Sequence, residues 1–156
     1  MKYHDLDYHD QVYLALGPHE IKQGKVIRAG IEMVEVEVQR EDYSHATYPI
    51  WREDGGPTSG QWPWLVGACR DSRFFRRCLK EIATGHRVIV LRSEVALVNW
   101  LSPPTFLVNE VKGDHFVAYP MNELRPHLKF SLADGQEYPA NTKADHYVAG
   151  VLFEQP

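Results

Sequence analysis

Alternating apolar and polar residues mark much of the chain as β-strand. The alternation is clearest in residues 25–39, where Val34, Val36 and Val38 are separated by Glu residues. Successive side chains of a strand point to opposite faces, so this segment is predicted to be a strand with one buried and one wet face. Gly30 is expected to form a bulge or bend within it.

Further strands are predicted wherever short apolar runs end in turn-forming residues. Residues 105–111 and 115–119 are expected to form a hairpin across Lys112-Gly113-Asp114. The other predicted strands cover residues 88–91, 129–132 and 146–153, and a short apolar run covers residues 12–16.

One segment has the spacing of a helix instead. Phe74, Phe75, Cys78, Leu79 and Ile82 recur at the interval that lines one helical face.

Signals at both ends delimit this helix. Asp71 or Ser72 can cap its beginning, and Gly85 is placed to end it. For residues 93–101 a two-turn helix is favoured over a continuation of the strand at 88–91, and a helical turn is predicted for residues 121–128.

Together these elements predict an α+β fold. We expect a mainly antiparallel sheet of about six or seven strands, with one main amphipathic helix (residues 72–84) and one or two short helices packed on one face. The length of 156 residues fits a single globular domain covering residues 1–156, with a long connection rich in Gly, Pro and aromatic residues at 40–63. No repeat of the 20-to-50-residue kind found in solenoids is visible.

Composition and charge narrow the function classes. The net charge of −4 argues against a protein that coats nucleic acid. No apolar run reaches the roughly 20 residues of a membrane span, and the N-terminus lacks the apolar stretch of a secretory signal. Two cysteines are too few for a disulfide framework, so a cytoplasmic location is expected.

A short motif around the first cysteine has a known counterpart. Cys69-Arg70-Asp71-Ser72-Arg73 resembles the Cys-x-Asp-Ser-Arg signature of β-class carbonic anhydrases, in which the cysteine binds zinc. That family also needs a His-x-x-Cys pair downstream, but Phe130 stands where the cysteine would follow His127. Because a zinc site needs its other ligands, we predict none here.

Two weaker chemical candidates remain. Cys69 is expected just before a helix N-terminus, where a thiolate is favoured, so it is a candidate nucleophile. His4, Asp7 and His9 have the side chains of a divalent-metal site, although a spacing of five between the histidines suits neither a helix face nor a strand face. No cofactor is expected.

Two surface features favour binding over catalysis. The helix region concentrates positive charge, and guanidinium groups there can grip phosphates or a partner's carboxylates. The 40–64 segment concentrates aromatic side chains of the kind that dominate interfaces. The predicted binding residues are Arg70, Arg73, Arg76, Arg77, Lys80, Tyr48, Trp51, Trp62 and Trp64.

The leading hypothesis is therefore a small non-enzymatic binding protein, an inhibitor or accessory factor. Its expected partner is an acidic protein or a small anionic ligand, with nucleic acid less favoured and no membrane. One alternative is a small cysteine- or metal-dependent enzyme, or a domain that binds a nucleotide-sized ligand. A second alternative is an oligomeric structural component.

Overall fold

The computed structural model describes residues 2–70, 72–92, 105–121, 127–138 and 146–153, and the fold is given for these residues. They form one helix, α1 (Arg73–Lys80), and a series of strands. The strands are β1 (Gln11–Gly17), β2 (Glu20–Ala29), β3 (Met33–Gln39), β4 (His45–Trp51), β5 (Trp64–Cys69), β6 (Arg87–Arg92), β7 (Thr105–Lys112), β8 (His115–Pro120), β9 (Leu128–Ser131) and β10 (His146–Leu152).

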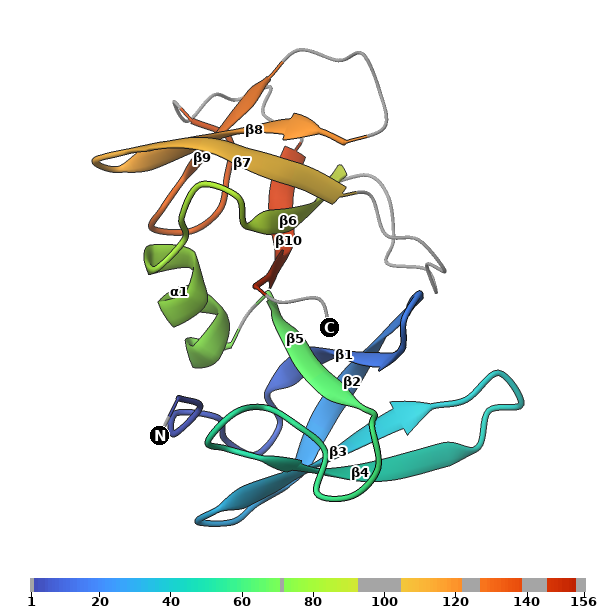
Figure 1. The fold of residues 1–156 in the computed structure, drawn as a ribbon. Helices are drawn as coiled ribbons and strands as arrows, with labels where there is room; N and C mark the ends of the chain where they lie inside the picture. The colour runs from blue at the N-terminus through green and yellow to red at the C-terminus, as the bar shows by residue number, and fades with distance from the viewer. Residues whose placement is uncertain (1, 71, 93–104, 122–126, 139–145, 154–156) are drawn as a thin grey trace.

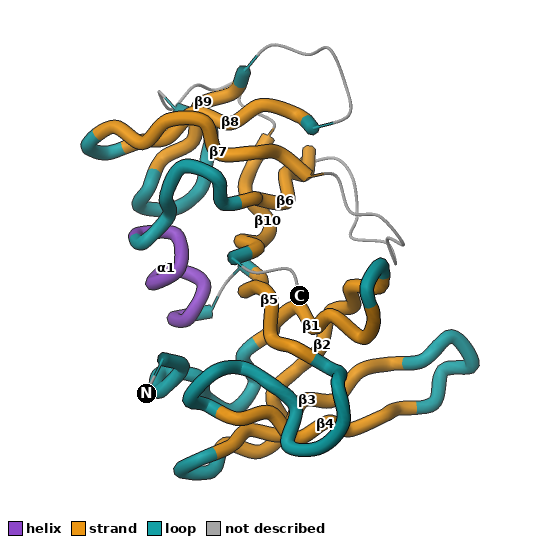
Figure 2. Tube along the Cα trace, in the orientation of Figure 1, coloured by secondary structure: helices purple, strands orange, loops and turns teal. Residues whose placement is uncertain are grey.

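All ten of these strands belong to one antiparallel sheet with the order β4-β3-β2-β1-β5-β10-β6-β7-β8-β9. Figure 1 shows its two curled halves, β1–β5 and β6–β10, which meet where β5 lies beside β10. Helix α1 lies at the side of this junction and contacts both β5 and β10. Figure 2 shows how much of the described chain is strand.

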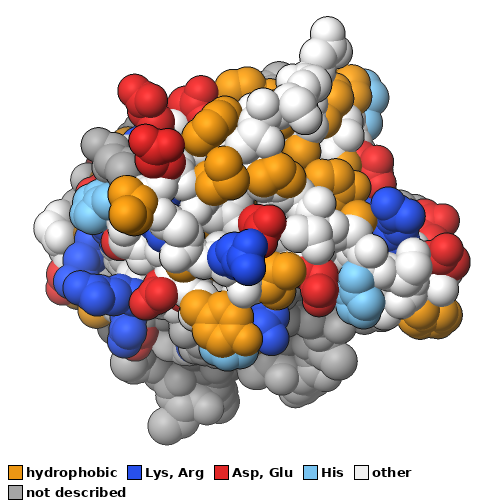
Figure 3. All heavy atoms as spheres, turned by 90° about the horizontal axis from the view of Figure 1, so that it is seen from below, with side chains coloured by type: hydrophobic (Ala, Val, Ile, Leu, Met, Phe, Trp, Pro, Cys, Tyr) orange, Lys and Arg blue, Asp and Glu red, His pale blue; other side chains and the backbone are white. Residues whose placement is uncertain are grey.

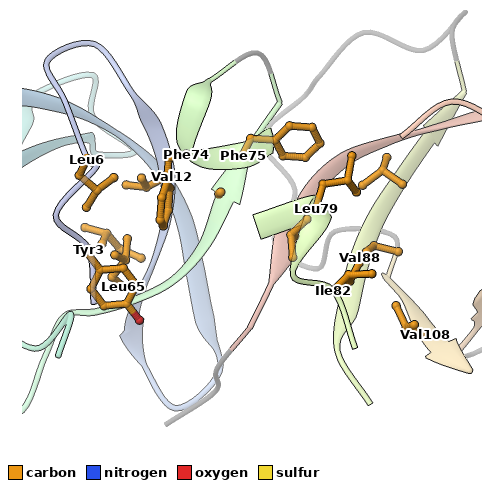
Figure 4. Close-up of a cluster of buried hydrophobic side chains, with 14 of the residues drawn as sticks. Tyr3, Leu6, Val12, Leu65, Phe74, Phe75, Leu79, Ile82, Val88 and Val108 are labelled. Atoms are coloured by element: carbon orange, nitrogen blue, oxygen red, sulfur yellow. The ribbon is translucent and has the colours of Figure 1, made fainter. Parts of the chain in front are cut away.

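Two clusters of buried side chains lie on opposite faces of the central strands. Along β1, Val12 and Leu14 enter the larger cluster, whereas Tyr13 and Ala15 enter the smaller one. The larger cluster runs through both halves and also contains the buried face of α1, part of which is seen in Figure 4. Because both faces of the centre are buried, the middle strands are apolar on both sides rather than alternating.

The predicted α+β class is therefore wrong. The described residues are nearly all β, with ten strands and a single helix of eight residues. The helices predicted within residues 93–101 and 121–128 lie largely outside the described residues. The count of six or seven strands was too low because the apolar run of β5 carries no alternation, because β4 lies inside the predicted connection, and because two strands were merged into one.

The merged pair is β2 and β3. Residues 25–39 were expected to form one strand bent at Gly30, but the chain reverses there and β2 pairs with β3. The Gly30 N–H donates to the carbonyl of Met33 at 2.9 Å, which closes the turn. A glycine between two apolar runs marks a bulge and a turn equally well, so the pattern alone could not distinguish them.

A strand also lies inside the predicted connection at 40–63. In β4, Ala46 and Ile50 are buried, whereas His45 and Thr47 are exposed. Pro49 does not break the strand because β4 is an edge strand. Its carbonyl points away from β3 and accepts from the Thr58 N–H, so its nitrogen also faces the outer edge, where no N–H is needed for pairing with β3.

The main helix begins as predicted and ends early. Ser72 is the N-cap, and its hydroxyl accepts from the Phe75 N–H at 2.8 Å. The helix ends at Lys80 instead of residue 84. Ile82 follows in the next turn, where its side chain is buried and its N–H donates to the carbonyl of Leu79. Gly85 does have a positive φ of 94°, in the turn that leads to β6.

Candidate functional site

Helix α1 separates apolar and basic side chains. Phe74, Phe75 and Leu79 are buried in the larger cluster. Figure 4 shows all three in the core close-up.

The opposite side of the helix carries Arg73, Arg76 and Lys80, which are all exposed. Residues three and four apart lie on one helical face, so these three form a continuous stripe about 10 Å long. We call this stripe the basic ridge.

The cations of the basic ridge have no carboxylate partner among the residues that the structure describes. In the described part of the chain, Arg73, Arg76 and Lys80 form no ion pair. The first turn of α1 also contains no acidic residue. The ridge is therefore a local concentration of positive charge on a protein whose net charge is −4.

Arg77, which was predicted to belong to the binding set, has a different position. Its Nε lies 2.6 Å from Oδ2 of Asp5, and its side chain is only 29% exposed. It also pairs with Glu81 at 3.7 Å and donates to the carbonyl of Lys2. Arg77 therefore attaches the N-terminal segment to α1.

Arg70 is likewise engaged within the protein. Its guanidinium lies 4.5 Å from the ring centroid of Tyr147. With its oxygen turned toward this guanidinium, the side-chain amide of Gln136 also accepts from it. Arg70 thus stands apart from the ridge, over the C-terminal half of the sheet.

The predicted aromatic residues do not form one surface with the ridge. Tyr48 packs against the larger cluster, whereas Trp62 and Trp64 pack against the smaller cluster on the opposite face from α1. Trp51 is half-buried at the end of β4, where it pairs with Met33. The structure therefore separates the two features that the sequence suggested would act together.

Figure 3 shows the molecule from the side of β2, β3 and β4. Hydrophobic side chains gather over much of this face, with charged groups among them. Lys and Arg side chains cluster at the left edge of the view, the side on which α1 lies in Figure 1.

Cys69 is placed for packing. Its side chain lies in the smaller cluster, and desolvation by burial raises the pKa of its thiol to about 12, which a hydrogen bond with Tyr13 only partly offsets. A reactive cysteine needs the opposite shift. Cys78, on the partly buried side of α1, has its pKa raised to about 12, mainly by burial.

The N-terminal metal candidates do not converge. His4, Asp7 and His9 are all exposed, and the Asp7 N–H donates to the carboxylate of Asp10 in a local turn. Among the residues that the structure describes, no three His, Cys, Asp or Glu side chains are grouped so that they could hold a metal ion.

One buried polar residue was missed by sequence reasoning. Arg52 is only 6% exposed. Its guanidinium donates to the carbonyls of Gly30, Tyr3, His4 and Leu6 at 2.8 to 3.2 Å. Arg52 thereby fixes the N-terminal segment onto the first half of the sheet. Its place in a Gly- and Pro-rich stretch gave no sign of this role.

Two histidine–carboxylate pairs in the second half were also missed. His115 Nδ1 lies 2.9 Å from Asp114, and its ring stacks on Tyr138 with centroids 4.3 Å apart. Tyr138 donates to the other oxygen of Asp114, and the hydrogen bonds from His115 and Tyr138 lower the pKa of Asp114. His146 pairs with Glu137 at 2.5 Å. Asp114 and His115 are neighbours that were interpreted as turn residues entering a strand, and nothing in the spacing along the chain connects them with Tyr138, or Glu137 with His146.

The chain matches no protein-family model, no curated protein and no solved structure. Within the described residues, no helix is long and apolar enough to cross a membrane.

Proposed function

We propose that this protein is a non-enzymatic binding protein that docks an acidic protein surface onto the basic ridge of α1. The observation that carries the proposal is the absence of any ion pair at Arg73, Arg76 and Lys80 within the described part of the chain. As far as the described residues go, these cations keep their capacity to pair with a partner.

The geometry of the ridge favours a particular kind of partner. Two guanidinium groups on one side of a helix can each take a carboxylate in a two-point hydrogen bond, and a lysine one turn further adds a third charge. Carboxylates spaced over about 10 Å, as on one face of a short acidic helix, match this stripe.

A defined probe tests the proposal. The probe is a labelled alanine-based helical peptide with glutamates at positions i, i+3 and i+7, titrated by fluorescence anisotropy at low and high salt. We expect saturable binding that weakens as salt screens the charges. In the variant R73E/R76E, two attractions become repulsions of about 0.2–1 kcal/mol each, so affinity should fall about tenfold.

The matched control is R40E/K129E, which changes the net charge equally at exposed positions in the β3–β4 turn and β9. We expect this control to bind the peptide within about twofold of the parent protein. Equal weakening by both variants would show a general charge effect and would overturn the proposal, as would failure of the parent to bind. An RNA oligonucleotide of equal charge that binds more tightly than the peptide would also overturn it.

A further inference from the structure

The strand order of the sheet reads the same from its two ends. β4-β3-β2-β1-β5 is followed by β10-β6-β7-β8-β9, so each half is a meander whose fifth strand returns beside its first. β5 pairs antiparallel with β1, and β10 pairs antiparallel with β6. The two halves therefore have the same topology.

The pairing of β5 with β10 is symmetric. Ala68 faces Val151 at its centre, with Gly67 opposite Leu152 on one side and Cys69 opposite Gly150 on the other. Beyond these pairs, the Arg70 N–H donates to Ala149 and the Phe153 N–H donates to Val66, each at 2.9 Å. An approximate two-fold axis thus passes between the strands, as it does between the subunits of a symmetric dimer.

The turns that follow β4 and β9 are alike in detail. Gly55 has φ +76° and Gly135 has φ +75°, a conformation that glycine adopts without strain. Asp54 and Asp134, one residue earlier, each accept the N–H two positions further on. Three pairs of backbone hydrogen bonds also match, each from an N–H to a carbonyl. Gly55 donates to Trp51 as Gly135 donates to Ser131, and Trp51 donates to Gly56 as Ser131 donates to Gln136. Leu65 donates to Gly55 as Val148 donates to Gly135.

Irregularities elsewhere also correspond. β2 has a bulge after Val26, and β7 has one after Val108. These two valines accept the N–H of His9 and Gly85, respectively, and both donors have positive φ. A shared meander explains a shared strand order, but it does not fix where bulges and positive-φ residues fall.

We infer that the chain is an internal duplication, in which residues 3–70 and 79–153 are two copies of one module. The edges of β5 and β10 are then the module's own docking surface, and the partner that fits this surface is a second copy of the module. This inference is independent of the proposed function. It also assigns Arg73 and Arg76 to the linker between the copies rather than to either copy.

Exchange of the two docking strands in the full-length chain tests the inference. The six residues of β5, Trp-Leu-Val-Gly-Ala-Cys, are placed at positions 147–152 of β10, and the residues at those positions, Tyr-Val-Ala-Gly-Val-Leu, are placed in β5. The glycine stays in register, which matters because a Cβ at Gly67 would lie 2.3 Å from the carbonyl of Val151. We expect a folded protein whose Tm falls by less than about 10 °C, as volume-conserving exchanges allow.

The matched control has the same exchanged composition, with the glycine moved one position in each strand, and we expect it to lose the cooperative transition. A smaller exchange, W64Y/L65V/Y147W/V148L, provides a second measurement, with the reversed order W64L/L65W as its control. Both exchanges should keep the parent's amide NMR pattern away from the altered strands. If both exchange variants have melting temperatures no higher than those of their controls, the inferred duplication is overturned.

Discussion

Replacing Arg52 by leucine should destabilise the protein, because this side chain bonds the N-terminal segment to the first half of the sheet. The Arg52 guanidinium is buried and donates to carbonyls of Gly30, Tyr3, His4 and Leu6. Leu132 holds the corresponding position in the second half, one residue after Ser131, and packs against the larger cluster, so a leucine suits the local backbone.

The magnitude follows from the hydrogen bonds. Nε contributes one bond, and Nη1 has two protons for its three carbonyl contacts, so about three bonds form at full strength. A hydrogen bond with a charged group contributes about 1.5–3 kcal/mol, and the apolar burial of leucine offsets part of the loss. We expect the R52L variant to lose about 3 kcal/mol of unfolding free energy, which lowers Tm by about 6–12 °C in a chain of this length.

Urea unfolding followed by tryptophan fluorescence measures this loss, and hydrogen exchange locates it. In R52L, hydrogen exchange of the Leu6 and Asp10 amides, which bond within the N-terminal segment, should accelerate relative to the parent more than exchange of the amides of β6–β10. The variant R52K keeps the charge but cannot reach all of the carbonyls, so it should lie between the parent and R52L. An R52L protein within about 0.5 kcal/mol of the parent would refute the role assigned to Arg52.

Three further predictions rest on other groups. Removing Arg77 in R77M leaves the carboxylate of Asp5, whose side chain is 14% exposed, without this partner, so Tm should fall, and adding D5N should restore part of it; no recovery would contradict the pairing. NMR titration should place the pKa of Asp114 below its ordinary value of 3.8, so that its interactions stabilise the fold above pH 3.8 and are lost as pH falls from there through the lowered pKa; a pKa at or above 3.8 would contradict the hydrogen bonds. With pKa values near 12, Cys69 and Cys78 should resist iodoacetamide at pH 8 until urea unfolds the chain, and rapid labelling of Cys69 in the folded protein would revive the cysteine-enzyme alternative.

Local patterns predicted individual elements better than they predicted the fold. The hairpin of β7 and β8 and the cap at Ser72 are confirmed, because a short turn and an N-cap depend on neighbouring residues alone. β5 was not counted as a strand because it is buried on both faces and has no alternation, and β4 lay inside the predicted connection at 40–63. Once these strands were missed, the balance between sheet and helix was misjudged.

The duplication left too little trace in the sequence to be seen. Matched positions such as Trp64 and Tyr147, or Leu65 and Val148, have similar size and hydrophobicity but different identity. Packing and backbone geometry constrain volume and φ, so equivalent structure persists while the residues differ. The Asp-Gly turns at Gly55 and Gly135 are an exception, because a positive φ narrows the choice of residue.

Of the candidate site, the sequence could predict only the part that depends on local spacing. Charge on a helix face can be read from spacing, so the exposure of Arg73, Arg76 and Lys80 followed from the sequence. The pairing of Arg77 with Asp5 could not be foreseen, because it depends on how the N-terminal segment folds back against α1. The tryptophans could not be assigned to a face without knowing the strand order.

The basic ridge is unfavourable for the helix that carries it. Arg73 and Arg76 are three apart, Arg76 and Lys80 are four apart, and like charges at these spacings repel by about 0.2–0.5 kcal/mol per pair. Arg73 also stands in the first turn, where the helix dipole disfavours a cation. A purely structural linker would gain stability from acidic residues there, so R73E/R76E should be at least as stable as the parent. Loss of peptide binding in a variant that is no less stable would separate the function of the ridge from the stability of the fold.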